Sequence, residues 1–439
     1  MAEVALPIET PVVTDSPGAG PLPTTERYKL LLAAGFVLLL LEFAAPSAGL
    51  IGLPILFFLK NRLHLNVQAV AGFNFWASFP LFFSFAFGFL RDRWNPFGTG
   101  DRGYLIGFGL ITAVLFTGLA FIHPTYVTML VGVLLVSSGG LIAGSAARGL
   151  TSSVGQKNSV TGQAGVIVNM AVLMPGVVAF GLGGFLSQAL EGQGAVTAAR
   201  TLFLVGAALM AGVALFGVLG PRRLLDAHRP ETQGEFTFLA DVGRLLGHWP
   251  IYPVLIIYVL WQFAPAGGVA LQFHLADNLH ATAGQVGLWY ALFSAGFIPV
   301  IAAYGWLCQK VKLSTLLWVG TLLAVPQFVP FLFIHSVNDA LIAAVVMGVM
   351  GGIGQAAYVD LAIRSCPKGL QGTMMMLLIA MYWIPYRVGD IWGAYLYHRQ
   401  GGFHAAIVAT ICVYALILPM LLLVPKRLTN SADGQVAAA

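Results

Sequence analysis

Long apolar runs, separated by short polar breaks or breaks containing glycine and proline, follow one another along almost the whole chain. A helix needs about 20 mainly apolar residues to cross about 30 Å of hydrocarbon, and the pattern divides into twelve such runs. The predicted spans are 29–59, 66–90, 103–122, 125–148, 161–190, 197–219, 250–276, 283–308, 313–334, 338–364, 370–397 and 403–424. The sequence therefore predicts an all-α membrane protein with twelve transmembrane helices.

Polar segments at both ends and in the middle of the chain divide it into five parts. The N-terminal part is rich in proline and glycine and lacks both a basic stretch and an apolar run before a cleavage site, so we expect a disordered tail rather than a signal peptide. In the middle part, the apolar residues between Leu239 and Leu246 follow helical spacing and predict a short interfacial helix. The five predicted parts are a disordered cytoplasmic tail (1–26), a six-helix bundle (27–220), a cytoplasmic linker (221–249), a second six-helix bundle (250–425) and a disordered tail (426–439).

The composition supports a membrane protein and excludes several other classes. Of the 439 residues, 58% are hydrophobic and 9% are charged, against about 25% charged in an average soluble domain, which excludes a soluble enzyme. The three cysteines, Cys308, Cys366 and Cys412, are far apart and indicate neither a disulfide framework nor a metal site. The sequence has no motif of a hydrolytic enzyme or of an ATP-binding domain, so we assign no catalytic residue, no metal and no cofactor.

Lysine and arginine residues are distributed unequally between the two sides of the predicted spans. If both termini face the cytoplasm, most of the 22 Lys and Arg residues lie on the cytoplasmic side, as the positive-inside rule requires. These charges are spread over short loops and are not clustered, which argues against nucleic-acid binding. We therefore expect a monomeric, multi-pass protein of the plasma (inner) membrane, surrounded by lipids, with both termini in the cytoplasm.

The two halves of the chain resemble each other at a nearly constant offset. His64 matches His280, the stretch 88–93 matches 305–310, and Arg148 matches Arg364. Because each half has six spans, the halves share one orientation, and an axis along the membrane normal would relate them, with a substrate site near the midplane between them. Duplication in a scaffold that transports nothing is the alternative explanation.

Three stretches carry a resemblance to a known family. They are residues 54–65 (PILFFLKNRLHL), 88–107 (GFLRDRWNPFGTGDRGYLIG) and 364–378 (RSCPKGLQGTMMMLL). Together with the twelve spans and the charged loop after the second span, they resemble the major facilitator superfamily, and most of all its folate-biopterin transporter family. The resemblance implies the superfamily fold, with two parallel six-helix halves.

The same resemblance implies a function. It indicates a secondary active transporter that works by alternating access and moves a small polar or aromatic organic solute, pterin- or folate-like or an organic anion. We expect protons as the coupling ion, while the direction of transport stays open. Members of the family usually carry acidic residues in the fourth span, where this chain has residues 141–147 (LIAGSAA), so the resemblance supports fold and transport better than it supports one substrate. A membrane scaffold, assembly factor or sensor with the same fold is the alternative.

Ionisable groups inside the spans are candidate site residues because burying them in hydrocarbon is costly. Glu42 lies about 20 Å from the cytoplasmic end of the first span at 1.5 Å per residue, close to the midplane. It is a candidate for proton coupling or for substrate contact, and a structural carboxylate bonded to a neighbouring helix is the alternative. Gln262 and Gln355 add candidate hydrogen-bonding groups.

In the eleventh predicted span, Arg387 and Asp390 are three residues apart on one helix face, next to Tyr386. An anionic or aromatic substrate could compete with the aspartate for the arginine, with the aromatic ring stacking on it. A permanent structural ion pair is equally compatible with this spacing.

Charged residues at the cytoplasmic ends of spans are candidate gating groups. By analogy with the superfamily, Asp92, beside Arg93, would cap the N-terminus of a neighbouring helix and pair with Arg148 at the end of the fourth span, holding the cytoplasmic side closed. Gln309 replaces this acid in the second half, so we expect an asymmetric lock.

The tenth predicted span contains a second candidate gating pair. Asp360 and Arg364 are four residues apart and could pair along the helix. This pair could close a gate or bind substrate.

Overall fold

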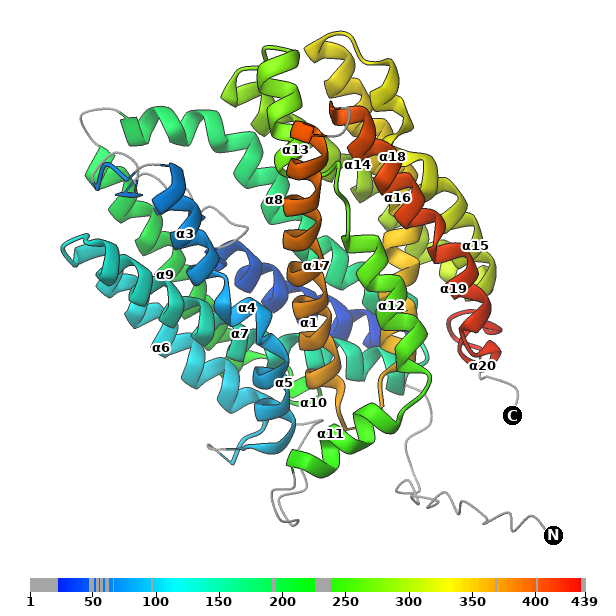
Figure 1. Cartoon of the computed structure of the whole chain (residues 1–439). Helices are drawn as coiled ribbons and strands as arrows, with labels where there is room; N and C mark the ends of the chain where they lie inside the picture. Colours follow the sequence, from blue (N-terminus) through cyan, green and yellow to red (C-terminus); the bar gives the residue numbers. More distant parts are fainter. Residues whose placement is uncertain are drawn as a thin grey trace.

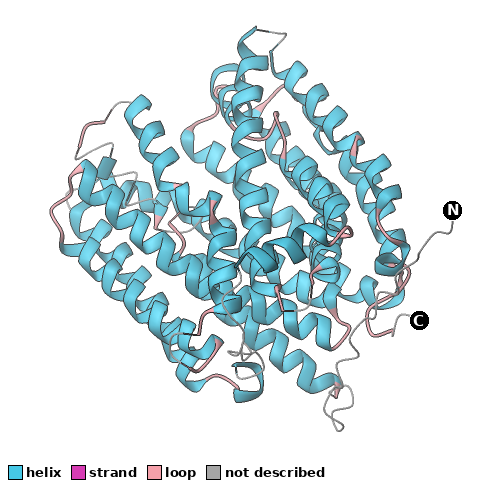
Figure 2. Cartoon of the chain, turned by 60° about the horizontal axis from the view of Figure 1, so that its bottom comes forward, coloured by secondary structure: helices cyan, strands magenta, loops and turns pink. Residues whose placement is uncertain are grey.

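The computed structural model describes residues 23–46, 51–52, 55, 58–59, 63–65, 67–95, 98–191, 195–225, 238–367, 369–399 and 402–435. These residues form helices, turns and loops, and none of them is in a strand (Figure 2). The first half contains α1 (Thr24–Ala44), α3 (Val67–Ala77), α4 (Phe79–Phe82), α5 (Ser84–Arg93), α6 (Asp101–Phe121), α7 (Tyr126–Lys157), α8 (Thr161–Glu191) and α9 (Ala195–Leu219). This all-helical structure is the one that the apolar pattern predicts.

The linker and the second half follow the same plan. The linker carries α10 (Arg222–Leu225) and α11 (Phe238–Gly247). The second half contains α12 (Ile251–Gln262), α13 (Val269–Phe273), the π-helix η2 (His274–Asn278), α14 (Ala283–Lys310), α15 (Leu313–Ala324), the 3₁₀-helix η3 (Val325–Phe333), α16 (Val337–Ser365), α17 (Gln371–Arg399), α18 (Gly402–Ala415), α19 (Ile417–Leu423) and α20 (Lys426–Thr429). α11 forms where the linker helix was predicted, and its interfacial position stays a prediction.

The helices form two bundles that lie side by side (Figure 1). Within the bundles, α6 packs on α9 in the first half and α14 packs on α16 in the second. The halves meet where α8 contacts α14 and α16, and where α17 contacts α5 and α7. The start of α1 and the helix α20 lie toward the same end of the molecule, which we call the terminal face (Figure 1).

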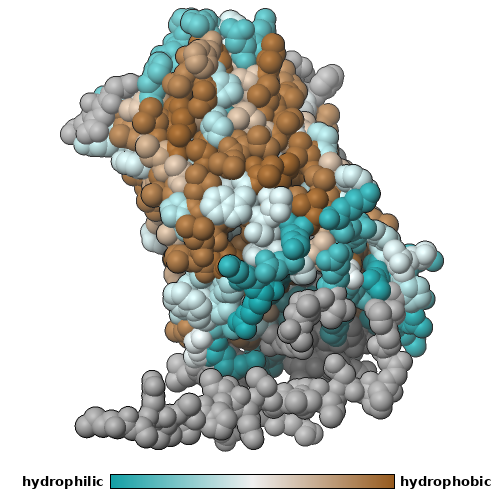
Figure 3. Space-filling view, turned by 90° about the vertical axis from the view of Figure 1, so that its right-hand side faces the viewer, coloured by the Kyte–Doolittle hydropathy of each residue, from teal (hydrophilic) through white to brown (hydrophobic). Residues whose placement is uncertain are grey.

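Eight of the described helices are long and apolar enough to cross a membrane. The remaining four predicted spans fall on α1, on α3 to α5, on α12 to η2 and on α17, which carry more charge, are less apolar or are interrupted. On the side seen in Figure 3, apolar residues form a broad band between hydrophilic residues at either end. This distribution fits a protein surrounded by hydrocarbon along its middle.

The sequence repeat is also a structural repeat. His64 and His280 both have a left-handed backbone, with φ of 51° and 56°. In each case the next residue's amide donates to a carbonyl six residues back, from Leu65 to Leu59 at 3.0 Å and from Ala281 to Leu275 at 2.8 Å, a geometry that ends helices. The two halves therefore turn in the same way at matched positions.

The first span of each half is interrupted near a proline. α1 ends at Ala44, just before Pro46, and α12 ends ahead of Pro265, since proline cannot donate to the helix and disfavours the helical conformation in the residue before it. The second interruption leaves amides that other helices satisfy, because Ala266 donates to Thr410 Oγ1 at 2.9 Å. Such breaks are tolerated at membrane depth where the backbone is buried in protein or lines a cavity.

The end of the chain corrects one prediction. A disordered tail was expected from residue 426, but α20 is helical and Asp433 is 6% exposed. The expectation was wrong for residues 426–435 because buried polar groups at the terminal face hold this segment, as described below. The N-terminal tail lies almost entirely outside the described residues, as do residues 436–439.

Close packing of α14 on α16 depends on glycine. A Cβ added to Gly296 would lie 2.6 Å from the carbonyl oxygen of Val345, whereas one added to Gly118, on the exposed side of α6, would meet nothing within 4 Å. We expect Gly296→Ala to lower stability by about 1–3 kcal/mol because the helices must move apart. Gly118→Ala is the matched control and should be neutral or stabilising. Thermal unfolding in detergent measures both, and equal melting temperatures would contradict the prediction.

Candidate functional site

A cavity of about 580 Å³ lies between the two halves. Its size is in the range of pockets that hold small organic molecules. Helices of both halves line it, so that any relative motion of the bundles changes its shape. Its charged and amide lining residues are Glu42, Arg148, Asn169, Gln262, Gln272, Gln327, Gln355 and Arg387, and its aromatic ones include Tyr258, Trp261, Trp289, Tyr290, Phe293, Tyr382, Trp383, Tyr386 and Tyr414.

Glu42 forms an ion pair with Arg148 in the cavity wall. The carboxylate comes from the last turn of α1, and Nη2 of the arginine donates to its Oε1. Arg148 was predicted at the end of its span, but α7 continues to Lys157, about two and a half turns further. The predicted contact between Arg148 and Asp92 is therefore wrong, because the arginine lies too deep in the bundle.

An amide chain connects the two halves across the cavity. Gln355 of α16 donates through Nε2 to Asn169 Oδ1 of α8 at 2.8 Å. Its Oε1 accepts from the indole nitrogen of Trp261 in α12 at 2.5 Å. Gln355 thus lines the cavity, as expected of a candidate site residue, and its amide has partners on both sides.

Two other buried amides face the cavity with an atom that has no partner among the described residues. They are Nε2 of Gln262, whose residue is 8% exposed, and Oε1 of Gln327, whose residue is 2% exposed. A buried polar group without a partner costs about 1–3 kcal/mol. A donor and an acceptor are therefore available to a bound molecule. Gln327 was not predicted, although an amide between Pro326 and Pro330 in an apolar span was a possible signal.

Arg387 is the loosely held cation of the cavity. Its side chain is 42% exposed, and Nη1 lies 3.6 Å from Asp390 Oδ2. The guanidinium carbon lies 5.7 Å from the ring centroids of both Trp383 and Tyr386. Asp390 is buried, is not among the lining residues, and accepts from the amide of Val269 at 3.2 Å, at the start of α13. The aspartate therefore has a structural partner of its own, while the arginine faces the cavity with Tyr386.

Asp92 lies at the terminal face and caps a helix of the other half. Its carboxylate accepts from the amides of Gly372 and Thr373 at 3.1 and 2.7 Å, at the N-terminus of α17. It also accepts from Arg91 Nη1 at 2.7 Å. This is the capping contact that was predicted, and it joins the halves through a favourable charge at a helix N-terminus. Arg93 is exposed in the last turn of α5.

Arg91, which was not predicted, donates to Asp92 and holds it in place. It is 1% exposed and donates through Nε and Nη2 to both oxygens of Asp101 at 2.6 Å. Burial alone would lower the pKa of Arg91, but the carboxylates of Asp101 and Asp92 hold it above its ordinary value. The guanidinium therefore stays charged and fixes the orientation of the capping carboxylate.

Asp360 and Arg364 pair as their spacing predicted, and they do so at the terminal face, outside the cavity lining. Arg364 Nε donates to Asp360 Oδ1 at 2.9 Å and to Thr161 Oγ1, in α8 of the other half, at 3.0 Å. Asp360 is fully buried and accepts from the Tyr304 hydroxyl at 2.9 Å. Both residues therefore belong with the contacts that join the halves, and Asp360 is not placed to meet a molecule in the cavity.

The comparisons with known proteins agree with this fold. The sequence model of the major facilitator superfamily matches residues 266–438, and that of the BT1 family matches residues 47–235. A folate-biopterin transporter of Synechocystis sp. (strain ATCC 27184 / PCC 6803 / Kazusa) is 24% identical over 392 residues, which cover 82% of this chain and 75% of that protein.

Solved structures show the same architecture. The major facilitator superfamily transporter FucP in its outward conformation has a TM-score of 0.68 and 18% identity, over 91% of this chain and 98% of that one. The human organic anion transporter MFSD10 has a TM-score of 0.67 and 16% identity, over 91% and 100%. The fold is therefore that of the major facilitator superfamily, and the predicted resemblance to its folate-biopterin transporters is confirmed.

The ion pair between Glu42 and Arg148 gives a prediction about stability. We expect Glu42→Gln and Arg148→Gln each to cost about 1–3 kcal/mol, because each leaves a half-buried charge in the cavity wall without its partner, and the double variant to cost less than the sum. The exposed pair of Glu26 and Arg223 is the control, and its variants should each change stability by less than about 1 kcal/mol. Thermal unfolding measures all of them, and additive losses in the double variant would count against the pairing.

Proposed function

We propose that this chain is a secondary active transporter that moves a small polar or aromatic organic solute, pterin- or folate-like or an organic anion, by alternating access. The observation that carries the proposal is the cavity between the halves, which combines aromatic walls, unpartnered amide atoms and a loosely held arginine. A gradient supplies the energy, since the sequence carries no ATP-binding motif.

The chemistry of the lining favours a flat heteroaromatic solute. Such a ring carries hydrogen-bond donors and acceptors on its edge, which match the free Nε2 of Gln262 and the free Oε1 of Gln327. Its faces can stack on aromatic side chains such as Tyr382 and Tyr386. A negative group on the solute can draw Arg387 away from Asp390, because their contact of 3.6 Å is loose. A folate-biopterin transporter and an organic anion transporter are among the similar proteins, which agrees with these two features.

The contacts that join the halves at the terminal face support alternating access. Asp92 holds the N-terminus of α17, and Arg364 holds Thr161 of α8, both at the terminal face. Opening the cavity to that side requires these contacts to break, while the bundles keep their own packing. In this proposal Asp92, Arg93, Arg364 and Asp360 form the gate region.

Proton coupling is assigned to Glu42. When the carboxyl takes a proton, it loses the charge that neutralises Arg148, and the arginine becomes available to another anion in the same cavity. Proton uptake and anion binding would then favour each other. We further propose that the protein is a monomer in the plasma membrane, with lipids around it and both termini in the cytoplasm, as the distribution of Lys and Arg indicates.

The substrate prediction uses the two unpartnered amides. In a thermal-stability screen of the purified protein against pterins, folates, nucleobases, amino acids, sugars and organic acids, we expect pterins, folates or aromatic acids to raise the melting temperature. Gln262→Leu and Gln327→Leu should each weaken the binding of that solute about tenfold, without destabilising the free protein. Thr117→Val, on the exposed side of α6, is the control. Undiminished binding in both variants would contradict the assignment, and no response to any solute would favour a scaffold or sensor.

The coupling prediction concerns Glu42. In proteoliposomes, Glu42→Gln should abolish accumulation driven by a pH gradient and leave exchange between labelled and unlabelled solute intact, because a glutamine side chain cannot take up or release the coupled proton. Glu26→Gln, an exposed residue of the same helix, should behave as the wild type. Unchanged driven uptake in Glu42→Gln would refute the role of this residue.

A further inference from the structure

Two helix N-termini occupy equivalent places in the two halves, and both lie at the terminal face. They are the start of α17, which Asp92 caps from the first half, and the start of α8, which the second half approaches. The sequence repeat puts Gln309 at the position of Asp92. Gln309 carries no carboxylate, and its Nε2 donates to Gly305 O at 2.8 Å and to the Tyr28 hydroxyl at 3.4 Å. The second half therefore has no acid at the repeat position to cap α8.

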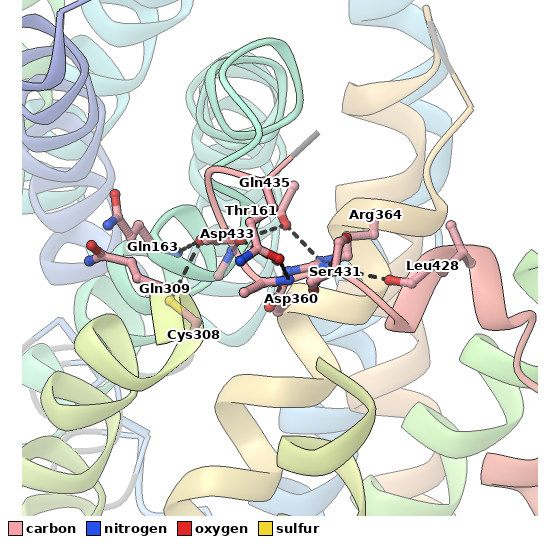
Figure 4. Close-up of polar contacts among 12 residues, drawn as sticks. Thr161, Gln163, Cys308, Gln309, Asp360, Arg364, Leu428, Ser431, Asp433 and Gln435 are labelled. Carbon is pink, nitrogen blue, oxygen red and sulfur yellow. Dashed lines mark hydrogen bonds and ion pairs between the residues drawn. The ribbon is translucent and has the colours of Figure 1, made fainter. Parts of the chain in front are cut away.

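The C-terminal tail supplies a carboxylate at that place. Asp433 Oδ1 accepts from the amide of Gly162 at 3.2 Å, and Oδ2 accepts from the amide of Gln163 at 3.1 Å (Figure 4). Asp92 bonds the corresponding amides of Gly372 and Thr373 in the same way. In both helices, the first bonded amide belongs to the glycine that follows the first helical residue. The two caps are therefore geometric counterparts, although one acid comes from a loop and the other from the tail.

The supporting cation is replaced as well. Arg91 stands beside Asp92, but the repeat puts Cys308 at its position in the second half. Arg364 takes over this role, with Nη2 at 3.0 Å from Asp433 Oδ1 (Figure 4). Each acid thus has two kinds of partner. One is a helix N-terminus of the other half, and the second is an arginine side chain that is mostly shielded from solvent.

Further contacts tie the tail to the second half. Arg364 Nη1 donates to the carbonyl oxygen of Ser431 at 2.8 Å and to that of Leu428 at 3.3 Å (Figure 4). The amide of Asp433 donates to the carbonyl oxygen of Cys308 at 2.8 Å. The tail contacts the first half through the two amides of α8, through the Thr161 hydroxyl, which donates to Asp433 Oδ1 at 3.4 Å, and through the amide of Gly434, which donates to Ser159 O at 2.7 Å.

We propose that the C-terminal tail is a gating element of the transport cycle, in which Asp433 supplies in place of residue 309 the carboxylate that holds α8 against the second half. This inference builds on the alternating access proposed above. When the terminal face opens, the contacts of Asp433 with Gly162 and Gln163 break, while those with Arg364 and Cys308 keep the tail on its own half. The lock is then two-sided, with Asp92 on α17 and Asp433 on α8.

The test measures the opening of the terminal face directly. Spin labels at Arg222→Cys, in the linker helix α10 that contacts α7 of the first half, and at Lys312→Cys of the second half, both exposed positions, report the distance across that face by pulsed electron paramagnetic resonance. Cys412→Ala removes the exposed cysteine of the chain, and the other two cysteines are buried. Molecules with the face open give a long distance, and molecules with it closed give a short one. We expect Asp433→Ala to raise the ratio of the open to the closed population about fivefold, as the loss of one helix cap implies. Asn430→Ala, at an exposed position of the same tail, is the matched control and should leave the ratio unchanged.

A second variant separates gating from misfolding. Adding Gln309→Asp to Asp433→Ala returns an acid to the repeat position and should shift the ratio back toward the wild-type value. An unchanged ratio in Asp433→Ala, or an equal rise in Asn430→Ala, would overturn the proposal. These distances need no substrate, so the tail can hold the face closed even if no solute is transported. If solute shifts the open-to-closed ratio of the wild type and the Asp433→Ala variant shows the same ratios with and without solute, transport is supported and the tail is refuted as a gate.

Discussion

Carboxylates at helix N-termini hold the two halves of this molecule together. A helix N-terminus presents amides without partners and a partial positive charge, so a buried acid there gains several hydrogen bonds and favourable electrostatics at once. Asp92 uses this interaction on α17 and Asp433 uses it on α8. Each acid also has a buried arginine beside it, so its burial leaves no uncompensated charge. Such contacts are firm while formed and can be exchanged for water when the halves part, which suits a gate better than continuous apolar packing would.

Close packing at glycine also holds helices together within each half. Within the bundles, helices approach through small residues, as at Gly296 on α14 and Gly348 on α16, where an added Cβ would meet backbone atoms. Lipid tails are as apolar as a leucine side chain, so burying apolar side chains between helices gains little. Close backbone packing is what holds membrane helices together. The interface between the halves adds polar contacts to such packing, as at Asp92 and Asp433. Motion is expected at that interface and not within the halves.

The charges of the cavity are arranged differently from those of the terminal face. Asp360 and Arg91 are buried and have several fixed partners each. Among the described residues, Arg387 has a long contact with Asp390 and two aromatic neighbours, and Glu42 and Arg148 pair with each other. Because these charges have few partners, a bound solute or a proton can take the place of one of them. This contrast distinguishes residues that hold the structure from residues that are available to a ligand.

The sequence alone determined the helical class, the repeat and the cavity candidates Glu42, Gln262, Gln355 and Arg387, because these follow from apolar run length, from constant spacing and from the cost of polar groups in hydrocarbon. The capping role of Asp92 came from the resemblance to the superfamily. The sequence misplaced Arg148, since α7 continues past that residue to Lys157 and so leaves the arginine within the bundle. It missed Arg91, Gln327 and Asp433. Only the tertiary structure decided these, because a buried partner, an unpartnered amide or a tail bound to a distant helix depends on which residues the fold brings together, and no local pattern records that.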